Sequence, residues 1–270
     1  MDSALSSSFG NKLDKLKQII SDTGPVVVAV SGGVDSMTLN YLAHTILGKR
    51  CMSVHAVSPA VPKSAAARVA DYAEKYGWNT RFESVGEMED QDYLENPVNR
   101  CYFCKKNLYG FLGSISEGTI FSGTNVDDMT DFRPGLMAAS ENGVRHPYVE
   151  AEMSKADVRQ VARLYGLSDL SELPSSPCLS SRVETGIAIN KATLKKIDEV
   201  EDRIKGRFGL SVVRCRVVAS GIVIELGEQD FDSVSPMDQN DIRELVDPVF
   251  SGLDISVRPY VQGSAFKIGE

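Results

Sequence analysis

Residues 26–30 of the chain, Val-Val-Val-Ala-Val, form an unbroken apolar run that ends at the turn Ser31-Gly32-Gly33. Four of the five residues are β-branched, which favours a strand, and every position is apolar, which indicates burial on both faces. From Val34 onward, apolar residues recur at helical spacing. Strands buried on both faces occur mainly in parallel sheets covered by helices, so this segment constrains the chain to an α/β fold.

The alternation of strand and helix continues along the chain. Strands are expected at residues 52–57, 79–85 and 119–122, and helices at residues 11–22, 63–76 and 158–165. This order predicts a doubly wound parallel sheet. Near residue 185 the pattern changes to helices at residues 192–208 and 237–245 and strands at residues 212–218, 222–226 and 255–261. We therefore predict two domains, residues 1–185 and a smaller α/β domain of residues 186–270.

The turn after the first strand has the composition of a phosphate site. Gly32 and Gly33 allow the backbone to approach a ligand, and the unpaired amides at the start of a helix favour an anion. Ser31 and Ser36 add hydroxyl groups. Asp35 would repel a bare phosphate, so its presence predicts a Mg²⁺ ion between carboxylate and phosphate. A tight Gly-Gly turn with Asp35 and Ser36 favouring the helix start is the simpler alternative.

A polar segment follows the expected strand at residues 119–122. It contains Asn125, Asp127, Asp128 and Arg133. Open α/β sheets bind ligands at the carboxyl ends of their strands, so Asn125 and the aspartates are candidate ligands of Mg²⁺ or of substrate hydroxyls. Arg133 is a candidate for holding a carboxylate or phosphate. Helix capping explains each aspartate equally well.

Three of the five cysteines stand in polar surroundings. Cys101 and Cys104 form a CxxC motif followed by two lysines, and Cys178 follows Pro177. A CxxC alone fits half a zinc site, a redox pair or two ligands of an iron–sulfur cluster. Three thiolates on a [4Fe–4S] cluster leave one iron open for sulfide. We expect Cys51 and Cys215, which adjoin or lie in expected strands, to be small buried apolar residues.

Charge and composition limit the partners of the chain. The net charge is −8, which disfavours a long nucleic acid, because such ligands need a basic surface. Apolar stretches of 18 residues or more do not occur in the sequence, and residues 1–10 do not resemble a signal peptide. An odd number of cysteines in such a chain indicates reduced thiols, and we expect a cytoplasmic protein without membrane contact.

The turn Ser31 to Ser36 resembles the PP-loop of the ATP pyrophosphatase superfamily. The order of this turn, of Gly-Thr-Asn-x-Asp-Asp with Arg-Pro-Gly, and of Pro-Cys-Leu-Ser-Ser-Arg at residues 177–182 resembles LarE-type sulfur transferases over about the whole chain. The resemblance implies cleavage of ATP between the α and β phosphates and adenylation of a substrate carboxylate. It assigns the handling of sulfur to Cys178.

The implied substrate is pyridinium-3,5-biscarboxylic acid mononucleotide, a small nucleotide precursor of the nickel-pincer nucleotide cofactor. Because the chain has the CxxC, it resembles the members in which a [4Fe–4S] cluster on Cys101, Cys104 and Cys178 binds sulfide from an external source. The resemblance also implies a homo-oligomer. Arg182, within the cysteine motif, and Arg214 are candidate contacts to the anionic ligand.

Three alternatives share some of these features. A tRNA thiolation enzyme has the loop and the cysteines, but it should also have a basic face. An amide-forming synthetase of the NAD or GMP synthetase type uses ammonia and needs no such cysteines. A nucleotide-binding regulatory module would bind ATP without cleaving it, and release of pyrophosphate distinguishes it from the enzymes.

Overall fold

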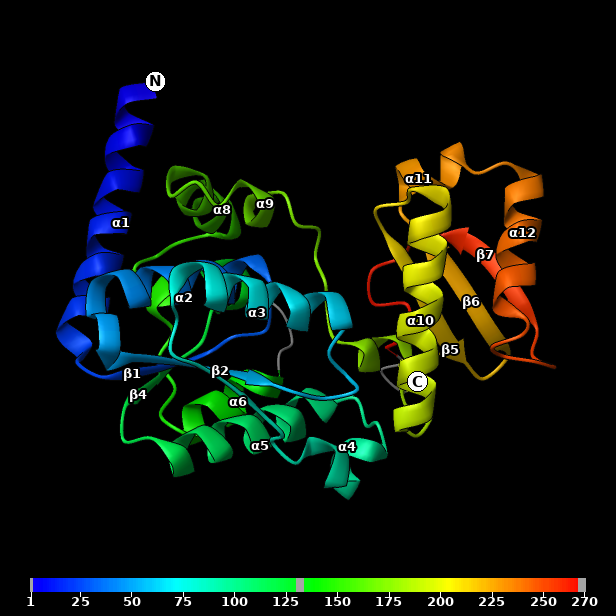
Figure 1. Cartoon of the computed structure of the whole chain (residues 1–270), viewed down its shortest axis with the longest axis horizontal. Coiled ribbons are helices and arrows are strands. Elements are labelled where there is room, and N and C mark those ends of the chain that lie inside the picture. Colours follow the sequence, from blue (N-terminus) through cyan, green and yellow to red (C-terminus); the bar gives the residue numbers. More distant parts are fainter. Residues whose placement is uncertain (1, 130–133, 267–270) are drawn as a thin grey trace. The chain divides into compact units, whose positions relative to one another are not determined.

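Four parallel strands form a sheet in the order β3-β2-β1-β4. The strands are β1 Val26–Ala29, β2 Cys51–Ala56, β3 Thr80–Glu83 and β4 Thr119–Phe121. The computed structural model describes residues 2–129 and 134–266, with side chains from Ser8 (Figure 1). In the register, Val26 pairs with Cys51 on one side and with Thr119 on the other, so β1 lies in the interior of the sheet. The predicted α/β fold class is confirmed.

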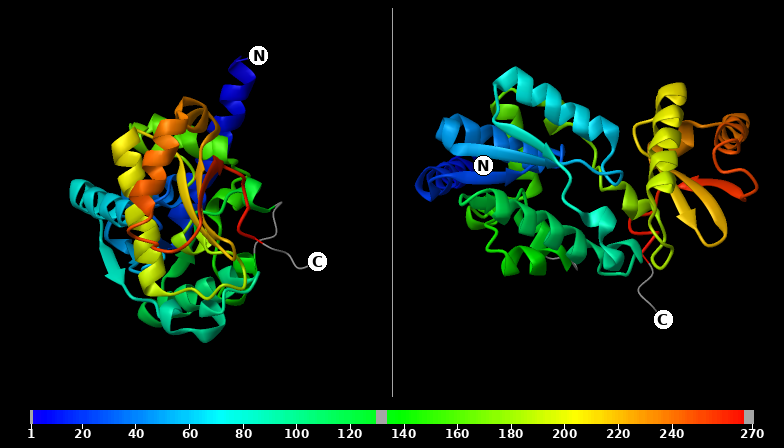
Figure 2. Two further views of the ribbon diagram at one scale, coloured as in Figure 1. Left: turned by 90° about the vertical axis from the view of Figure 1, so that its right-hand side faces the viewer. Right: turned by 60° about the horizontal axis from the view of Figure 1, so that its bottom comes forward.

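Helices cover both faces of this sheet (Figures 1 and 2). One apolar core contains Val26 and Val28 of β1 and the helices α1 Asp2–Thr23, α2 Val34–Leu47, α3 Lys63–Tyr76, α7 Pro147–Glu150, α8 Lys155–Leu164 and α9 Ser168–Ser171. The other core contains Val27 of β1 and the helices α5 Arg100–Ile115 and α6 Pro134–Glu141. Successive side chains of a strand point to opposite faces, so β1 contributes to both cores, as its continuous apolar run predicts.

Local signals account for the helices that the sequence predicted well. Helix α3 has the predicted bounds and ends at Gly77, which adopts the left-handed conformation with φ of 64°. Helix α5, in contrast, was not predicted, because Gly110 and Gly113 lower its helix propensity and its apolar residues form no clear stripe.

None of the helices within residues 2–129 and 134–266 has the length and apolar character needed to cross a membrane.

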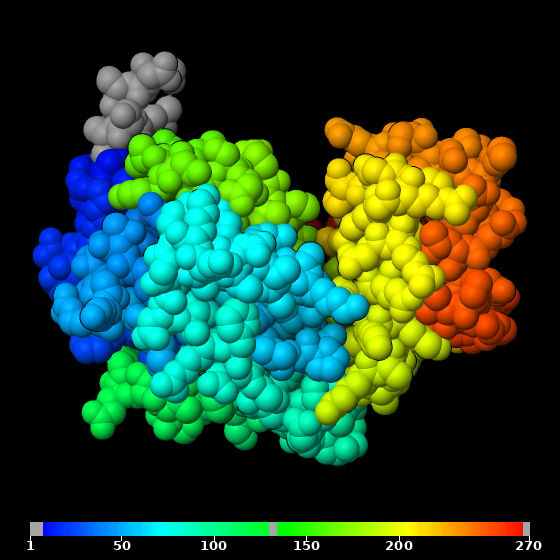
Figure 3. Space-filling view, in the orientation of Figure 1, coloured from blue at the N-terminus to red at the C-terminus, as the bar shows by residue number. Residues whose placement is uncertain are grey.

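A second, three-stranded sheet has the order β5-β6-β7. Strand β5 Val213–Val218 runs antiparallel to β6 Gly221–Leu226, and β7 Ile255–Pro259 runs parallel to β6. The helices of this part are α4 Gln91–Leu94, α10 Lys191–Phe208, α11 Glu228–Ser233 and α12 Pro236–Val246. The surface of α10, in yellow, faces the viewer in Figure 3. The strands and the two longer helices lie within a few residues of their predicted positions.

The two sheets belong to two compact units, whose bounds differ from the predicted ones. The first unit comprises Met1–Glu87 and Cys101–Ser175, and the second comprises Met88–Arg100 and Ser176–Glu270. The predicted boundary lies near residue 185, whereas the second compact unit begins at Ser176 and also includes the separate segment Met88–Arg100.

The buried side chain of Asn96 provides the physical reason for this division. Its Nδ2 donates to the backbone oxygens of Glu184 at 2.8 Å and Ile187 at 2.9 Å. The Gly186 amide in turn donates to the backbone oxygen of Asn96 at 3.0 Å. The hydroxyl groups of Tyr93 and Ser180 lie 2.6 Å apart. These bonds join residues 88–100 to residues 176–190, and the sequence offers no local sign of them.

We predict that Asn96→Ala lowers the free energy of unfolding of the second unit by about 2–4 kcal/mol. The change leaves buried carbonyl groups without their donor and places alanine at a φ of 55°. Urea denaturation followed by circular dichroism would measure the loss. The matched control is Asn240→Ala, whose exposed side chain bonds to Glu244 on its own helix. Equal stability of the two variants would contradict the role given to Asn96.

Candidate functional site

The site lies at the carboxyl ends of β1 and β4, which are neighbours in the sheet. From β1 the chain builds β2 and β3 on one side and then returns to place β4 on the other, so this is the topological switch point where open α/β sheets bind ligands. The loops after the two strands touch each other. A Cβ atom on Gly123 would lie 2.7 Å from the backbone nitrogen of Ser36, so only glycine fits there.

Gly32 also has a steric role, which its place in the predicted phosphate turn does not indicate. Its φ is 83°, and a Cβ atom on it would lie 2.6 Å from the backbone oxygen of Ala65 on α3. Glycine is thus required where the loop presses against α3. Gly33 is the N-cap of α2 and supplies no side chain to its first turn.

The first turn of α2 contains amides that have no partner within the helix. The Met37 amide makes the first bond within the helix, to the Gly33 oxygen at 3.1 Å. The amides of residues 34–36 precede it and have no partner within the helix. Together with the positive end of the helix dipole, they form an anion site. The turn therefore suits a phosphate, and phosphate binding by the loop stays a prediction.

The two serines of the loop bond to each other. The Oγ atoms of Ser31 and Ser36 lie 3.0 Å apart, and the Ser31 amide donates to Ser36 Oγ at 3.0 Å. Ser31 Oγ is also 3.4 Å from the Gly33 amide. These contacts hold the loop in its folded shape and keep both hydroxyl groups beside the open amides.

Arg68 of α3 fixes the orientation of the Gly32 carbonyl. No sequence motif indicates this role, because the two residues are 36 positions apart. Its Nη1 donates to the Gly32 oxygen at 2.7 Å. Because the C=O and N–H of a trans peptide point in opposite directions, this bond turns the Gly33 amide away from α3. Burial lowers the pKa of Arg68, while Asp169 and Tyr72 nearby oppose that change.

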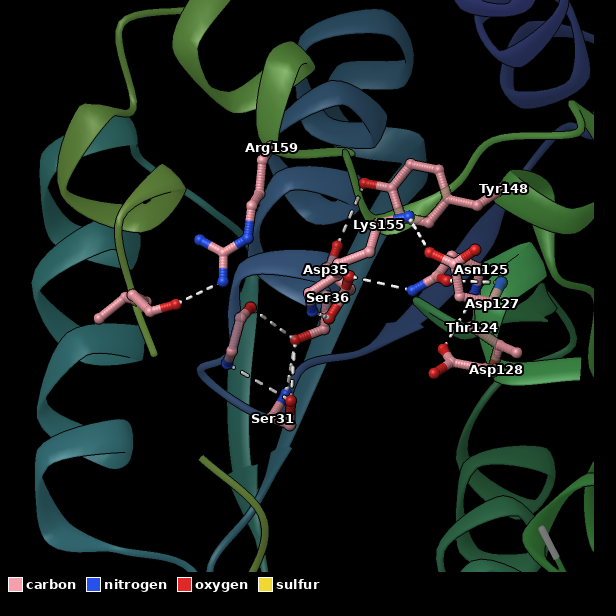
Figure 4. A network of polar contacts seen from close by, with 12 residues as sticks. Ser31, Asp35, Ser36, Thr124, Asn125, Asp127, Asp128, Tyr148, Lys155 and Arg159 are labelled. Atoms are coloured by element: carbon pink, nitrogen blue, oxygen red, sulfur yellow. Dashed lines mark hydrogen bonds and ion pairs between the residues drawn. The ribbon is translucent and has the colours of Figure 1, made fainter. Parts of the chain in front are cut away.

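Asp35 lies at the centre of a polar network (Figure 4). Its Oδ1 accepts a hydrogen bond from Asn125 Nδ2 at 3.3 Å, and its Oδ2 forms an ion pair with Lys155 Nζ. The Tyr148 hydroxyl donates to the Asp35 backbone oxygen at 3.2 Å. Asp35 and Asn125, both predicted from the sequence, are thus brought together. Lys155 and Tyr148 complete the network.

Lys155 was missed because the predicted helix began only at residue 158. Helix α8 begins at Lys155, and its capping box joins Ser154 and Asp157. A serine followed three residues later by an acidic residue is a sequence signal that could have placed the helix start correctly. One turn further along α8, Arg159 Nη2 donates to the Leu173 backbone oxygen at 2.7 Å.

The other acidic residues bond to the backbone. The Asn125 amide donates to Asp128 Oδ2 at 3.1 Å, and the Lys155 amide donates to Asp127 Oδ2 at 2.8 Å. Both aspartates thus accept a backbone amide, as the alternative of a capping role predicts. Asp128 lies beside Asn125 through its bond to the Asn125 amide. Arg133 lies outside the described residues.

The donor set around Asp35 fits Mg²⁺ bound together with phosphate. Within the described part of the chain, no three His, Cys, Asp or Glu side chains are arranged to hold a metal by themselves. Mg²⁺ in nucleotide enzymes is commonly held by one or two carboxylates and completes its shell with phosphate oxygens and water. Asp35, adjacent to the open amides, can supply such a carboxylate.

In the second unit, the backbone around Cys178 is firmly held. The side chain of Cys178 is exposed and precedes the short helix η4 Leu179–Arg182. Ser181 Oγ donates to the Cys178 oxygen at 2.7 Å, and Arg182 Nη1 donates to the Pro177 oxygen at 2.6 Å. The thiol is thus presented to solvent from a fixed backbone.

Arg182 and Arg214 were predicted as ligand contacts, but both are buried. Arg182 is 1% exposed and bonds to both carboxylate oxygens of Glu201, at 2.9 and 3.0 Å. Arg214 is 5% exposed and donates to the Val213 oxygen, and burial lowers its pKa. Arg182 supports the Cys178 segment, so its observed contacts are structural. A ligand contact of either arginine stays a prediction.

The cysteines divide between the units. Cys101 and Cys104 lie in the first turns of α5, three residues apart and both partly exposed, so they share one side of the helix and fit as two ligands of a cluster. Cys178 belongs to the second unit. The convergence of the three thiols stays a prediction. Cys51 and Cys215 are fully buried as expected, and burial raises the pKa of Cys51 to about 12.

Comparison with known proteins identifies relatives along most of the chain, although no family model matches. An uncharacterized protein of Synechocystis sp., slr1717, is 34% identical over 80% of this chain and 81% of its own length. The uncharacterized protein MJ0830 of Methanocaldococcus jannaschii is 27% identical over 93% of this chain and 98% of its own. A pyridinium-3,5-bisthiocarboxylic acid mononucleotide synthase of Lactiplantibacillus plantarum is 28% identical over 82% of each chain.

We predict that Arg68→Met weakens the binding of pyrophosphate to the loop about tenfold. Without Arg68, the peptide between Gly32 and Gly33 can turn its carbonyl oxygen toward the anion. Isothermal titration calorimetry would measure the affinity, and Arg68→Lys would separate loss of charge from loss of the hydrogen bond. Arg81→Met, which removes an exposed arginine of β3, is the control. Equal affinity of Arg68→Met and the control would contradict this role.

Proposed function

The chain belongs to the LarE-type family of PP-loop proteins, and we propose that it activates a substrate carboxylate with ATP and transfers sulfur to it. The proposal depends mainly on one observation: the amides of residues 34–36, which have no partner within α2, adjoin the Asp35 carboxylate at the switch point of the sheet. That arrangement suits a Mg²⁺-bound polyphosphate. We take the substrate to be pyridinium-3,5-biscarboxylic acid mononucleotide, in keeping with the product named for the relative from Lactiplantibacillus plantarum.

The first step activates the carboxylate, which is by itself a poor electrophile. A carboxylate oxygen of the substrate attacks the α-phosphorus of ATP, and the bond from that phosphorus to the β-phosphate oxygen breaks. The products are an acyl adenylate and pyrophosphate. The amides of residues 34–36 would stabilise the charge on the phosphate chain, and Asp35 would hold Mg²⁺, which neutralises the same charge.

The second step replaces AMP with sulfur. A sulfur nucleophile attacks the acyl carbon, and the bond from that carbon to the AMP oxygen breaks. We propose that Cys101, Cys104 and Cys178 would hold a [4Fe–4S] cluster, which would supply this sulfur as bound sulfide. The exposed thiol of Cys178 on its fixed backbone also suits direct attack. In that case the thioester sulfur would leave Cβ of Cys178 with the loss of the Cα proton, and dehydroalanine would remain.

The product would be a thiocarboxylate on the path to the nickel-pincer nucleotide cofactor. A homo-oligomer, an external sulfide source and a cytoplasmic location are further parts of the proposal and stay predictions.

We predict that Asp35→Ala abolishes Mg²⁺-dependent pyrophosphate release from ATP and leaves the fold intact. The carboxylate is partly exposed, with 23% of the side chain accessible, so its loss does not open a cavity in the core. Coupled-enzyme detection of pyrophosphate would measure the activity, and circular dichroism would test the fold. Asp22→Ala, at an exposed position in the same unit, is the control. Wild-type rates of ATP cleavage in Asp35→Ala would refute the proposed metal role.

We predict that replacing Cys101, Cys104 or Cys178 with alanine removes the cluster and repeated sulfur transfer, while adenylation survives. Iron and sulfide analysis after anaerobic purification would measure the cluster, with Cys51→Ala as the control.

If Cys178 alone transfers the sulfur, the variants should differ from one another in turnover. Cys101→Ala and Cys104→Ala would then keep one turnover, and mass spectrometry would show that the protein has lost about 34 Da.

A further inference from the structure

The ion pair between Lys155 and Asp35 occupies the position where the proposed function needs a metal. Lys155 Nζ contacts Asp35 Oδ2, and Asn125 Nδ2 contacts the other carboxylate oxygen at 3.3 Å. Asp35 itself is the second residue of α2, within the turn whose amides are open. A phosphate on those amides would lie beside the carboxylate, and the two anions repel unless a cation lies between them.

The backbone of Lys155 is held by hydrogen bonds, whereas its side chain is partly exposed. The Lys155 amide donates to Asp127 Oδ2 at 2.8 Å, and the capping box of Ser154 and Asp157 holds the start of α8. The side chain is 36% exposed. An ammonium group on a flexible four-carbon stem can leave one anion for another at little cost, because partly exposed ion pairs are weak.

The other partner, Asn125, is held far more rigidly. Its side chain is 2% exposed, and its Oδ1 accepts the Asp127 amide at 3.0 Å. Asn125 therefore fixes Asp35 through Oδ1, and only the ammonium on Oδ2 is exchangeable. The network keeps the carboxylate oriented whichever cation occupies the Oδ2 side.

We infer that the Lys155 ammonium stands in for Mg²⁺ on Asp35 in the nucleotide-free protein and that the incoming Mg²⁺–ATP displaces it onto the phosphate chain. This inference rests on the proposed function. Lys155 then has two roles: it weakens metal binding before the nucleotide arrives, and it binds a phosphate oxygen afterwards. Metal and nucleotide would therefore bind together, and the metal alone would bind weakly.

The test measures Mn²⁺ binding to the full-length, nucleotide-free protein by the electron paramagnetic resonance of free Mn²⁺. We expect Lys155→Gln to bind Mn²⁺ about tenfold more tightly than the wild type, because a competing positive charge is removed. Lys155→Arg, which keeps the charge, should remain close to the wild type. Lys15→Gln is the control, because Lys15 pairs with Glu152 at an exposed position. Adding Asp35→Asn to Lys155→Gln should abolish the gain.

A second measurement tests the phosphate contact. Lys155→Gln should bind Mg²⁺ with α,β-methylene-ATP, which cannot be cleaved, about tenfold more weakly than the wild type, despite its better metal site. The inference is overturned if Mn²⁺ affinity does not rise in Lys155→Gln, if the gain survives Asp35→Asn, or if analogue affinity is unchanged. Both measurements are independent of sulfur transfer, so failure of the proposed reaction leaves them interpretable.

Discussion

The burial of β1 on both faces is the constraint from which the rest of the first unit follows. Val27 packs into one core while Val26 and Val28 pack into the other, so the strand must lie between two layers of helices. Its neighbours β2 and β4 run parallel to it, and the carboxyl ends of β1 and β4 therefore meet at one edge. The loop that begins at Ser31 is placed at that edge by the apolar packing of β1.

Polar contacts then determine what the loop can bind. Arg68 on α3 orients the Gly32 carbonyl, and Asn125 in the loop after β4 orients the Asp35 carboxylate. The two side chains come from different segments, yet each acts on a loop of six residues. The proposed anion site is thus prearranged by the scaffold, which is how a protein stabilises developing charge without having to reorganise.

The sequence predicts those parts of the fold and site that local chemistry determines. The β1 run, the glycine loop and α3 with its terminating Gly77 all have strong local signals, and the structure confirms them. Helix α5 has no such signal, because packing rather than propensity stabilises it. The pairing of Lys155 with Asp35 spans 120 positions of the chain, and no spacing rule relates the two. The predicted role of Cys178, in contrast, comes from the family resemblance, because local patterns left it open.

The discontinuous second unit has a consequence for how the protein is made. Residues 88–100 leave the ribosome before all of residues 101–175, which belong to the first unit, and only then does the segment that receives the Asn96 side chain emerge. The parallel sheet can close during this interval, since β4 ends at Phe121. The nascent chain must therefore keep residues 88–100 unpaired and available while its neighbours on both sides fold. A fragment that begins at residue 176 would lack residues 88–100, which bond to residues 176–190. The smaller unit is therefore not encoded by one contiguous segment.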